Sequence, residues 1–295
     1  MSQSLKGSLV AFVAVLIISP DSLFVRLIAT DTATLLFWRG VGLGLALFAV
    51  MLAIHGRDTL ARYVAVGWPG LIAAALLAGS TVFFVVALSL TSVGNTLAMM
   101  STAPIFAAVA SRLVLKERTP LRTWIAAMAA VLCIVIIVSE SVGSGSFWGD
   151  IAAIGNGACL ASCFVFMRWR KSVSMIPAMS ISGVMTVIFA LTLGMPTPLS
   201  QPQWGLMLGL CFIILPVAFA MISFASRLIP SAELNMFLLM EMVFGPFFVW
   251  IVISEQLPRS TLIGGGILFV VLFIHSIAGI REERRILHAA PAVAS

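Results

Sequence analysis

Long, unbroken apolar runs are the feature of this sequence that most restricts how it can fold. A helix needs about 20 apolar residues to cross the hydrocarbon core of a bilayer, and runs of this length follow one another along the chain. They lack the alternation of apolar and polar residues that marks a membrane β-strand. Of the 295 residues, 61% are apolar and 9% are charged, whereas about 25% of a typical soluble domain is charged. We therefore predict an all-α integral membrane protein.

Ten transmembrane helices fit between the polar stretches. Their connections are short, so neighbouring helices are expected to run antiparallel, and no room is left for a substantial soluble domain. The predicted spans are Lys6–Ile28, Thr34–Ile54, Val66–Leu88, Asn95–Val114, Thr123–Glu140, Phe147–Trp169, Pro177–Met195, Trp204–Ser226, Glu233–Ile253 and Thr261–Ile280.

The positions of Lys and Arg predict the orientation of these helices, because basic residues gather at their cytoplasmic ends. With the N-terminus placed inside, the 17 Lys and Arg residues fall at inner ends and inner loops, except Arg26, Arg39 and Arg259. Both termini are therefore predicted to be cytoplasmic, which requires an even number of spans. The expected location is the inner (plasma) membrane, as a multi-pass protein.

The two halves of the sequence are similar to each other. Leu115–Pro120 aligns with Ile253–Pro258, so that a Glu-x-x-Pro turn precedes both the fifth and the tenth predicted span. Proline near the first helical position loses no hydrogen bond. Five spans per half is an odd number, so the second copy must be inverted, as in many secondary transporters. The predicted units are residues 1–142 and 143–280, followed by a cytoplasmic tail at 281–295.

With these features, the sequence resembles the drug/metabolite transporter superfamily, in its ten-span EamA-type branch. The resemblance rests on the duplicated five-helix unit and on two motifs at matching places: Thr102–Pro104 with Glu117, and Glu241-Met242 with Glu255. Met242 stands where the usual pattern has Pro. The stretch Ser19–Arg26 resembles exporters of aromatic and other amino acids. The resemblance implies two inverted five-helix repeats around a central cavity, and export of amino acids with some tolerance of hydrophobic cations.

Asp21 and Arg39 are the leading candidates for substrate binding. An ionisable group inside a span costs about 2.5–3.5 kcal/mol on insertion scales and usually faces a cavity or a partner. Asp21 follows Pro20, which breaks the first span and frees carbonyls that, with Asp21, could bind an ammonium. Arg39, beside the candidate Trp38, could bind a carboxylate through two hydrogen bonds. The alternative is that Asp21 and Arg39 pair with each other.

Two further ionisable groups are candidates for proton coupling. Glu241 lies near the middle of the ninth predicted span, where a carboxyl group is expected to hold a proton at rest and could carry it across. His275 lies past the centre of the tenth span. The alternative for each is a structural role, as a neutral group hydrogen-bonded to a neighbouring helix.

Neutral residues complete the predicted site. Asn95 and Asn156 could orient the substrate, with hydrogen bonds between helices as the alternative. Met99 and Met240 lie on spans that correspond in the repeat, and methionine suits an adaptable apolar pocket; simple packing is the alternative. Helix kinks that would allow alternating access are predicted at Pro20, Pro104, Pro216 and Pro246.

The sequence favours a transporter of small metabolites over an enzyme. The candidate charges are near balance, which suits a zwitterionic amino acid better than the alternative substrates, phosphorylated metabolites or sugar nucleotides. A membrane-embedded enzyme would need clustered acid, base or metal groups, and the candidates are spread over four helices. The cysteines have no His or carboxylate at metal-ligand spacing, so neither a metal nor another cofactor is expected. The expected partners are a small molecule and the lipid bilayer, not nucleic acid, and the sequence is compatible with a monomer.

Overall fold

The computed structural model describes residues 3–100, 102–116, 146–170, 173–225 and 240–254, together with residues 132, 228–229, 237–238 and scattered positions between 259 and 277. All regular elements in these ranges are helical. They are α1 (Gln3–Ile18), α2 (Asp21–Ile28), α3 (Thr32–His55), the 3-10 turn η1 (Gly56–Asp58), α4 (Thr59–Ala65), α5 (Gly67–Leu90), α6 (Val93–Met100), α7 (Ala103–Val114), α9 (Phe147–Trp169), α10 (Ile176–Leu193), α11 (Gln201–Leu208), the π-helical turn η2 (Gly209–Ile214), α12 (Leu215–Ala225) and α14 (Glu241–Ile253).

Seven stretches of the described residues are long and apolar enough to cross a membrane. Two of them, Lys6–Ile28 and Phe147–Trp169, have the bounds predicted from the sequence, and the others agree within a few residues, except that the second continues to Ala65. The all-helical membrane class is thereby confirmed. The predicted span Thr123–Glu140 lies almost entirely, and Thr261–Ile280 for the larger part, outside the described residues, so the count of ten and the inverted repeat stay predictions.

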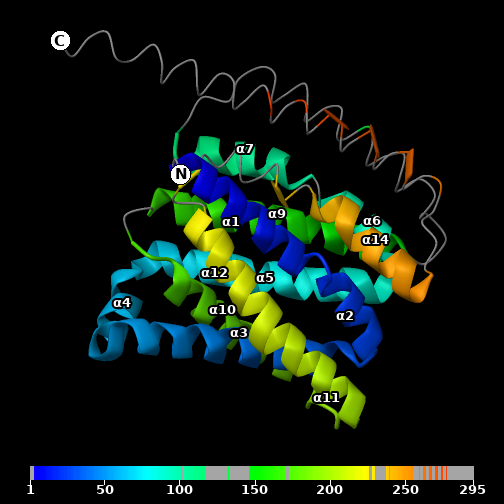
Figure 1. The fold of residues 1–295 in the computed structure, drawn as a ribbon, viewed down its shortest axis with the longest axis horizontal. Helices are drawn as coiled ribbons and strands as arrows, with labels where there is room; N and C mark the ends of the chain where they lie inside the picture. Colours follow the sequence, from blue (N-terminus) through cyan, green and yellow to red (C-terminus); the bar gives the residue numbers. More distant parts are fainter. Residues whose placement is uncertain are drawn as a thin grey trace.

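The helices of the two halves are interleaved. The main neighbour of α3 is α10, that of α5 is α9, and that of α1 is α12. Contacts between α3 and α5 within the first half are far fewer. Figure 1 shows most of these helices running along the long axis of the molecule, with the N-terminus and α4 at one end and the turn between α2 and α3 at the other. The core therefore forms between the halves.

Proline accompanies several interruptions of the long helices. The first span breaks at Ser19 and Pro20, between α1 and α2. The fourth breaks between α6 and α7, with Pro104 in the first turn of α7. Pro216 follows the π-helical turn η2, whereas Pro246 lies inside α14, which continues through it. Proline lacks the N–H that a continuous helix needs, and a π-helical turn is one way in which a helix absorbs such a loss.

Close approach of α3 and α10 depends on glycine. A Cβ atom added at Gly183 of α10 would lie 2.5 Å from the carbonyl oxygen of Gly40 and 2.7 Å from the backbone nitrogen of Gly44, both on α3. These neighbours are backbone atoms, which cannot move aside as a side chain can. The absence of a side chain at Gly183 therefore sets the distance between the two helices, as small residues do in membrane bundles.

A hydrogen-bonded cluster joins the α2–α3 turn to the segment before α11. Asp31 caps α3 by accepting from the Thr34 backbone N–H at 2.8 Å, and it accepts from the Thr197 hydroxyl at 2.7 Å. The Thr197 backbone N–H donates to the Thr34 hydroxyl at 2.7 Å. Partial burial raises the pKa of Asp31, but the hydrogen bonds from Thr197 and Thr34 outweigh it and lower the pKa from 3.8 to about 2. This cluster ties together segments more than 160 residues apart.

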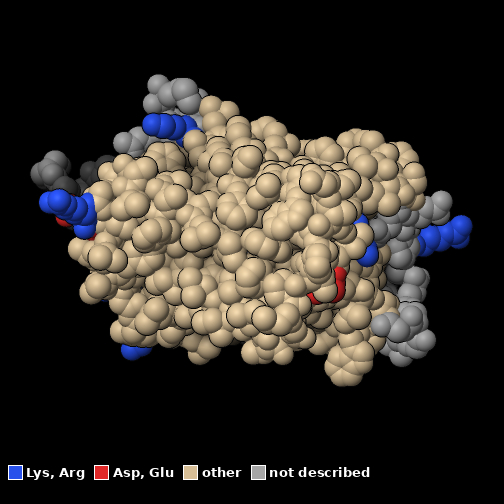
Figure 2. Space-filling model, turned by 90° about the horizontal axis from the view of Figure 1, so that it is seen from below, with Lys and Arg blue, Asp and Glu red and all other residues tan. Residues whose placement is uncertain are grey.

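The surface is largely uncharged. Figure 2 shows one face of the molecule as a broad expanse without Lys, Arg, Asp or Glu, whose charged side chains lie mainly toward the margins. Large apolar side chains are exposed on several helices, among them Leu45, Val184 and Ile213. A soluble protein would not present so much apolar surface, and lipid is the solvent that suits it.

Candidate functional site

A buried ion pair lies at the break in the first span. Asp21 is the first residue of α2 and Arg39 lies in α3, and the turn between these helices brings them side by side. Arg39 Nη1 donates to Asp21 Oδ1 at 2.5 Å, and Nη2 donates to Oδ2 at 2.8 Å. This two-bond geometry is the strongest that a guanidinium forms with a carboxylate. The two side chains are 5% and 6% exposed.

Burial explains why these two residues must meet. Removing a single charge from water costs several kcal/mol, which a partner with good geometry offsets. The Arg39 guanidinium also lies 5.5 Å from the centre of the Phe84 ring on α5, a distance that allows a cation–π contact. The sequence left open whether Asp21 and Arg39 bind substrate or pair with each other, and in the structure they form a pair. A role of either residue in binding substrate stays a proposal.

Glu241 is a second acidic residue near the Asp21–Arg39 pair. It is the first residue of α14 and is partly buried, and it lies close enough to interact electrostatically with both Asp21 and Arg39. One turn further along α14, Gly245 faces the helix break: a Cβ atom there would lie 3.7 Å from the carbonyl oxygen of Ser19 and 3.6 Å from the Ser22 hydroxyl. Two carboxyl groups and one guanidinium thus lie within electrostatic range of one another, near the contact between α2 and α14.

Asp150 is a buried acid that the sequence reasoning left out of the site. It lies in the first turn of α9 and is 0% exposed. Its Oδ1 accepts from the Thr91 hydroxyl at 3.2 Å and lies 3.5 Å from Asn95 Nδ2. Arg26 Nη2 donates to the Thr91 carbonyl at 2.8 Å. The predicted candidate Asn95 therefore belongs to a cluster that links the end of α5 to the starts of α6 and α9.

The other predicted residues lie in separate places. Asn156 on α9 is buried and accepts a 2.5 Å hydrogen bond from Ser80 on α5. Met99 is fully buried in an apolar cluster with Ala152 and Ala153. Trp38 is half-buried and packs edge-on against Trp204 of α11, with ring centres 4.7 Å apart.

Two further candidates lie at the edge of the described residues or beyond it. Met240 is half-buried and immediately precedes α14. His275 lies outside the described residues. Three of the sequence candidates, Asp21, Arg39 and Glu241, thus form one ionic cluster. Asn95 and Asn156 lie apart from it, each beside a polar side chain of a neighbouring helix.

An all-helical bundle with membrane-length helices and an ionic cluster in its interior defines a multi-pass membrane protein with a polar site between its helices. Residues 5–139 match the model of the EamA-like transporter family, so this part of the chain is similar to that family. The match agrees with the EamA-type resemblance found in the sequence.

Comparison with solved structures supports the fold over nearly the whole chain. One, described as a crystal structure of a protein, matches with a TM-score of 0.66 and 16% sequence identity, over 92% of this chain and 96% of that chain. At such low identity the likeness concerns the fold alone. No curated protein matches the sequence.

Proposed function

We propose that this chain is a secondary transporter that exports amino acids, aromatic or otherwise neutral, and accepts hydrophobic cations as a further class of substrate. The observation that carries the proposal is the buried pair of Asp21 and Arg39 with Glu241 beside it. The match of residues 5–139 to the model of a transporter family supports the general class.

The ionic cluster suits a zwitterion because each end of the substrate can replace one partner of the pair. The α-carboxylate of an amino acid would take the place of Asp21 at the Arg39 guanidinium, which binds carboxylates through two bonds. The α-ammonium would take the place of Arg39 at Asp21. Neither buried charge is then left alone, so the large penalty for an unpaired charge is avoided. A hydrophobic cation would use Asp21 alone and is expected to bind more weakly.

Glu241 is proposed to couple this exchange to a proton. With Asp21 and Arg39 paired, an ionised Glu241 leaves the cluster one negative charge in excess, whereas a protonated Glu241 leaves it neutral. Binding or release of a proton at Glu241 would therefore alter how tightly the cluster holds an ammonium. His275 remains a second proposed proton-coupling residue.

Helix breaks supply the movement that alternating access requires. The break at Pro20 adjoins Asp21 directly, and Gly245 of α14, which precedes Pro246, lies against it. In the proposal, the two halves form inverted repeats around a central cavity, both termini are cytoplasmic, and bending at Pro20, Pro104, Pro216 and Pro246 opens that cavity to one side at a time.

The other classes of function have less support. A phosphorylated metabolite or a sugar nucleotide would require several inward-facing basic residues, and Arg39 is the one basic side chain that is buried among the residues described. Within those residues, no three His, Cys, Asp or Glu side chains gather as metal ligands would.

The test is counterflow in proteoliposomes with labelled phenylalanine, labelled threonine and a lipophilic cation, with and without a pH gradient. We expect uptake of at least one amino acid, abolished in Asp21→Asn and Arg39→Gln, and loss of its pH dependence in Glu241→Gln. Asp58→Asn, which neutralises an exposed acid in η1, is the matched control and should transport normally. Absence of amino acid uptake would contradict the substrate class, and normal transport by the three variants would contradict the residue roles.

A further inference from the structure

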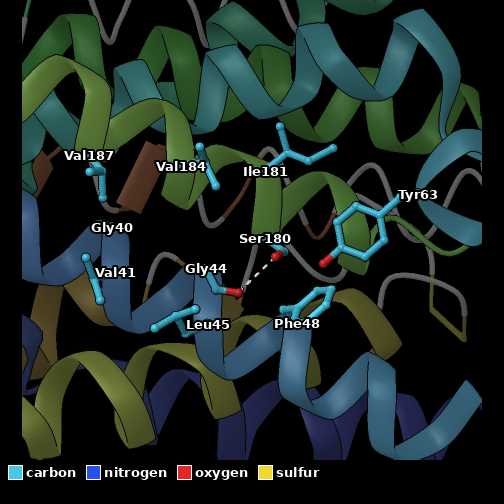
Figure 3. A pocket seen from close by; sticks show the side chains of 10 residues that line it. All are labelled: Gly40, Val41, Gly44, Leu45, Phe48, Tyr63, Ser180, Ile181, Val184 and Val187. Atoms are coloured by element: carbon cyan, nitrogen blue, oxygen red, sulfur yellow. Dashed lines mark hydrogen bonds between the residues drawn. The ribbon is translucent and has the colours of Figure 1, made fainter. Parts of the chain in front are cut away.

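A groove of about 330 Å³ lies between α3 and α10, at the side of the bundle where α4 approaches them (Figure 3). Val41, Leu45 and Phe48 of α3 line it together with Val184 and Val187 of α10, and Tyr63 of α4 stands at one end. The residues of the ionic cluster do not line it. This groove is therefore separate from the proposed transport site.

Glycine makes the floor of the groove. Gly40 and Gly44 lie where α3 and α10 approach each other closely, so backbone forms the bottom of the groove. The Ser180 hydroxyl donates to the Gly44 carbonyl at 2.9 Å, and the Tyr63 hydroxyl points toward Ser180 (Figure 3). The rest of the lining is hydrocarbon. Leu45 and Val184 on the two rims are each 57% exposed, so the groove opens outward, where the bilayer surrounds the protein.

Basic and aromatic residues mark the end of the groove near Tyr63 as the level of the lipid headgroups. Arg57 of η1 and Arg62 of α4 lie near Tyr63 in the sequence and are exposed. Nearby, Arg170 Nη2 donates to the Ala65 carbonyl at 3.3 Å. Trp68 and Trp169, both exposed, pack edge-on with ring centres 5.2 Å apart. Tryptophan and basic residues are enriched at the membrane interface.

The α4 helix itself has the character of an interfacial segment. Leu60 and Val64 lie one turn apart and are 71% and 80% exposed, so they present an apolar edge beside the charged Arg57 and Arg62. Such a helix lies in the headgroup region with its apolar side toward the acyl chains. The helix that carries Tyr63 at one end of the groove therefore also carries positive charge.

We infer that the groove between α3 and α10 binds one acyl chain of an anionic phospholipid, with the phosphate held by Arg57 and Arg62. The apolar lining matches the chain, the Tyr63 and Ser180 hydroxyls match the polar ester region, and the two arginines match the negative headgroup. The inference does not depend on what the protein transports.

Photolabelling of the full chain in phosphatidylcholine nanodiscs tests this. The probes are phosphatidylglycerol, phosphatidylcholine and a free fatty acid, each with a photoactivatable group on the acyl chain, and labelled peptides are identified by mass spectrometry. We expect phosphatidylglycerol to label α3 and α10 at the groove more strongly than the other probes. Val184→Trp should fill the groove and abolish that labelling. Arg62→Gln should reduce it about fivefold, the effect of one basic residue near an anionic surface.

Leu191→Trp is the matched control, because Leu191 lies on the same helix, is 44% exposed and does not line the groove. Its labelling should equal that of the unaltered protein. Labelling that persists in Val184→Trp would overturn the assignment of the groove. Equal labelling by phosphatidylcholine would overturn the selection of an anionic headgroup, and equal labelling by the fatty acid would overturn the phospholipid as the ligand.

Discussion

Thr197 donates a hydrogen bond of 2.7 Å to Asp31, and so joins the cap of α3 to the segment that leads into α11. The bond lies outside the membrane-spanning helices, where pH can act on it directly. It connects the two halves of the chain at the end of the bundle opposite α4 (Figure 1).

The hydrogen bonds to Asp31 predict a loss of stability in acid. Because the folded-state pKa is about 2 and lies below the ordinary value of 3.8, the carboxylate stabilises the fold above pH 3.8, and this contribution disappears as the pH falls toward 2. Asp31 is exposed, so its contribution is at most about 1 kcal/mol. Thermal unfolding in detergent should show this loss in the unaltered protein and a weaker pH dependence in Asp31→Asn. An equal pH dependence in both would contradict the prediction.

The Asp21–Arg39 pair predicts that removing one charge lowers the free energy of unfolding more than removing both charges. Asp21→Asn or Arg39→Gln leaves the other charge buried and unpaired, which should cost about 3–5 kcal/mol of unfolding free energy. The double variant removes both charges and should recover much of that loss. Denaturant unfolding of the four proteins measures the coupling. Additive losses would show that the pair does not act as a unit, and counterflow by the double variant would separate stability from transport.

We expect alanine to have different effects on stability at two glycines, Gly183 in the α3–α10 contact and Gly205 outside it. Gly183→Ala forces its Cβ atom against the backbone of Gly40 and should destabilise the protein by about 1–3 kcal/mol. Gly205 of α11 has no atom within 4 Å of an added Cβ, so Gly205→Ala should be neutral or stabilise by up to about 1 kcal/mol. Thermal unfolding of both variants provides the comparison. A neutral Gly183→Ala would mean that the helices can separate at little cost.

We expect Asp150 to stabilise the protein more through its hydrogen bond than through its charge. Asp150→Asn keeps an oxygen that can accept from Thr91, so it should cost less than about 1 kcal/mol, whereas Asp150→Leu removes the acceptor and should cost about 1–3 kcal/mol. Thermal unfolding separates the two variants. If Asp150→Asn is as damaging as Asp150→Leu, the negative charge itself is required.

The features that depend on local sequence pattern, the bounds of the helices and the break at Pro20, could be predicted from the sequence. Apolar run length gave most helix bounds, because the bilayer fixes the length of a span, and Pro20 marked the break beside Asp21. The pairing of Asp21 with Arg39 was one of two alternatives in the sequence analysis. Opposite charges on consecutive predicted helices can meet, because each charge needs a partner when it is buried.

Other parts depend on contacts between distant segments, which periodicity does not encode. Asp150 is not among the candidates from the sequence, yet it is completely buried and accepts a hydrogen bond from Thr91 at the end of α5. The groove between α3 and α10 arises because Gly40, Gly44 and Gly183 meet across more than 130 residues of sequence. Neither could be foreseen without knowing which helices are neighbours.

The interleaving of the two halves has a consequence for how the protein is made. When the ribosome has completed α7, the faces of α1, α3 and α5 that will contact α12, α10 and α9 have no protein partner yet. Lipid or the insertion machinery must shield them until the rest of the chain arrives. The packing of these helices is therefore completed only after the second half of the chain has been inserted.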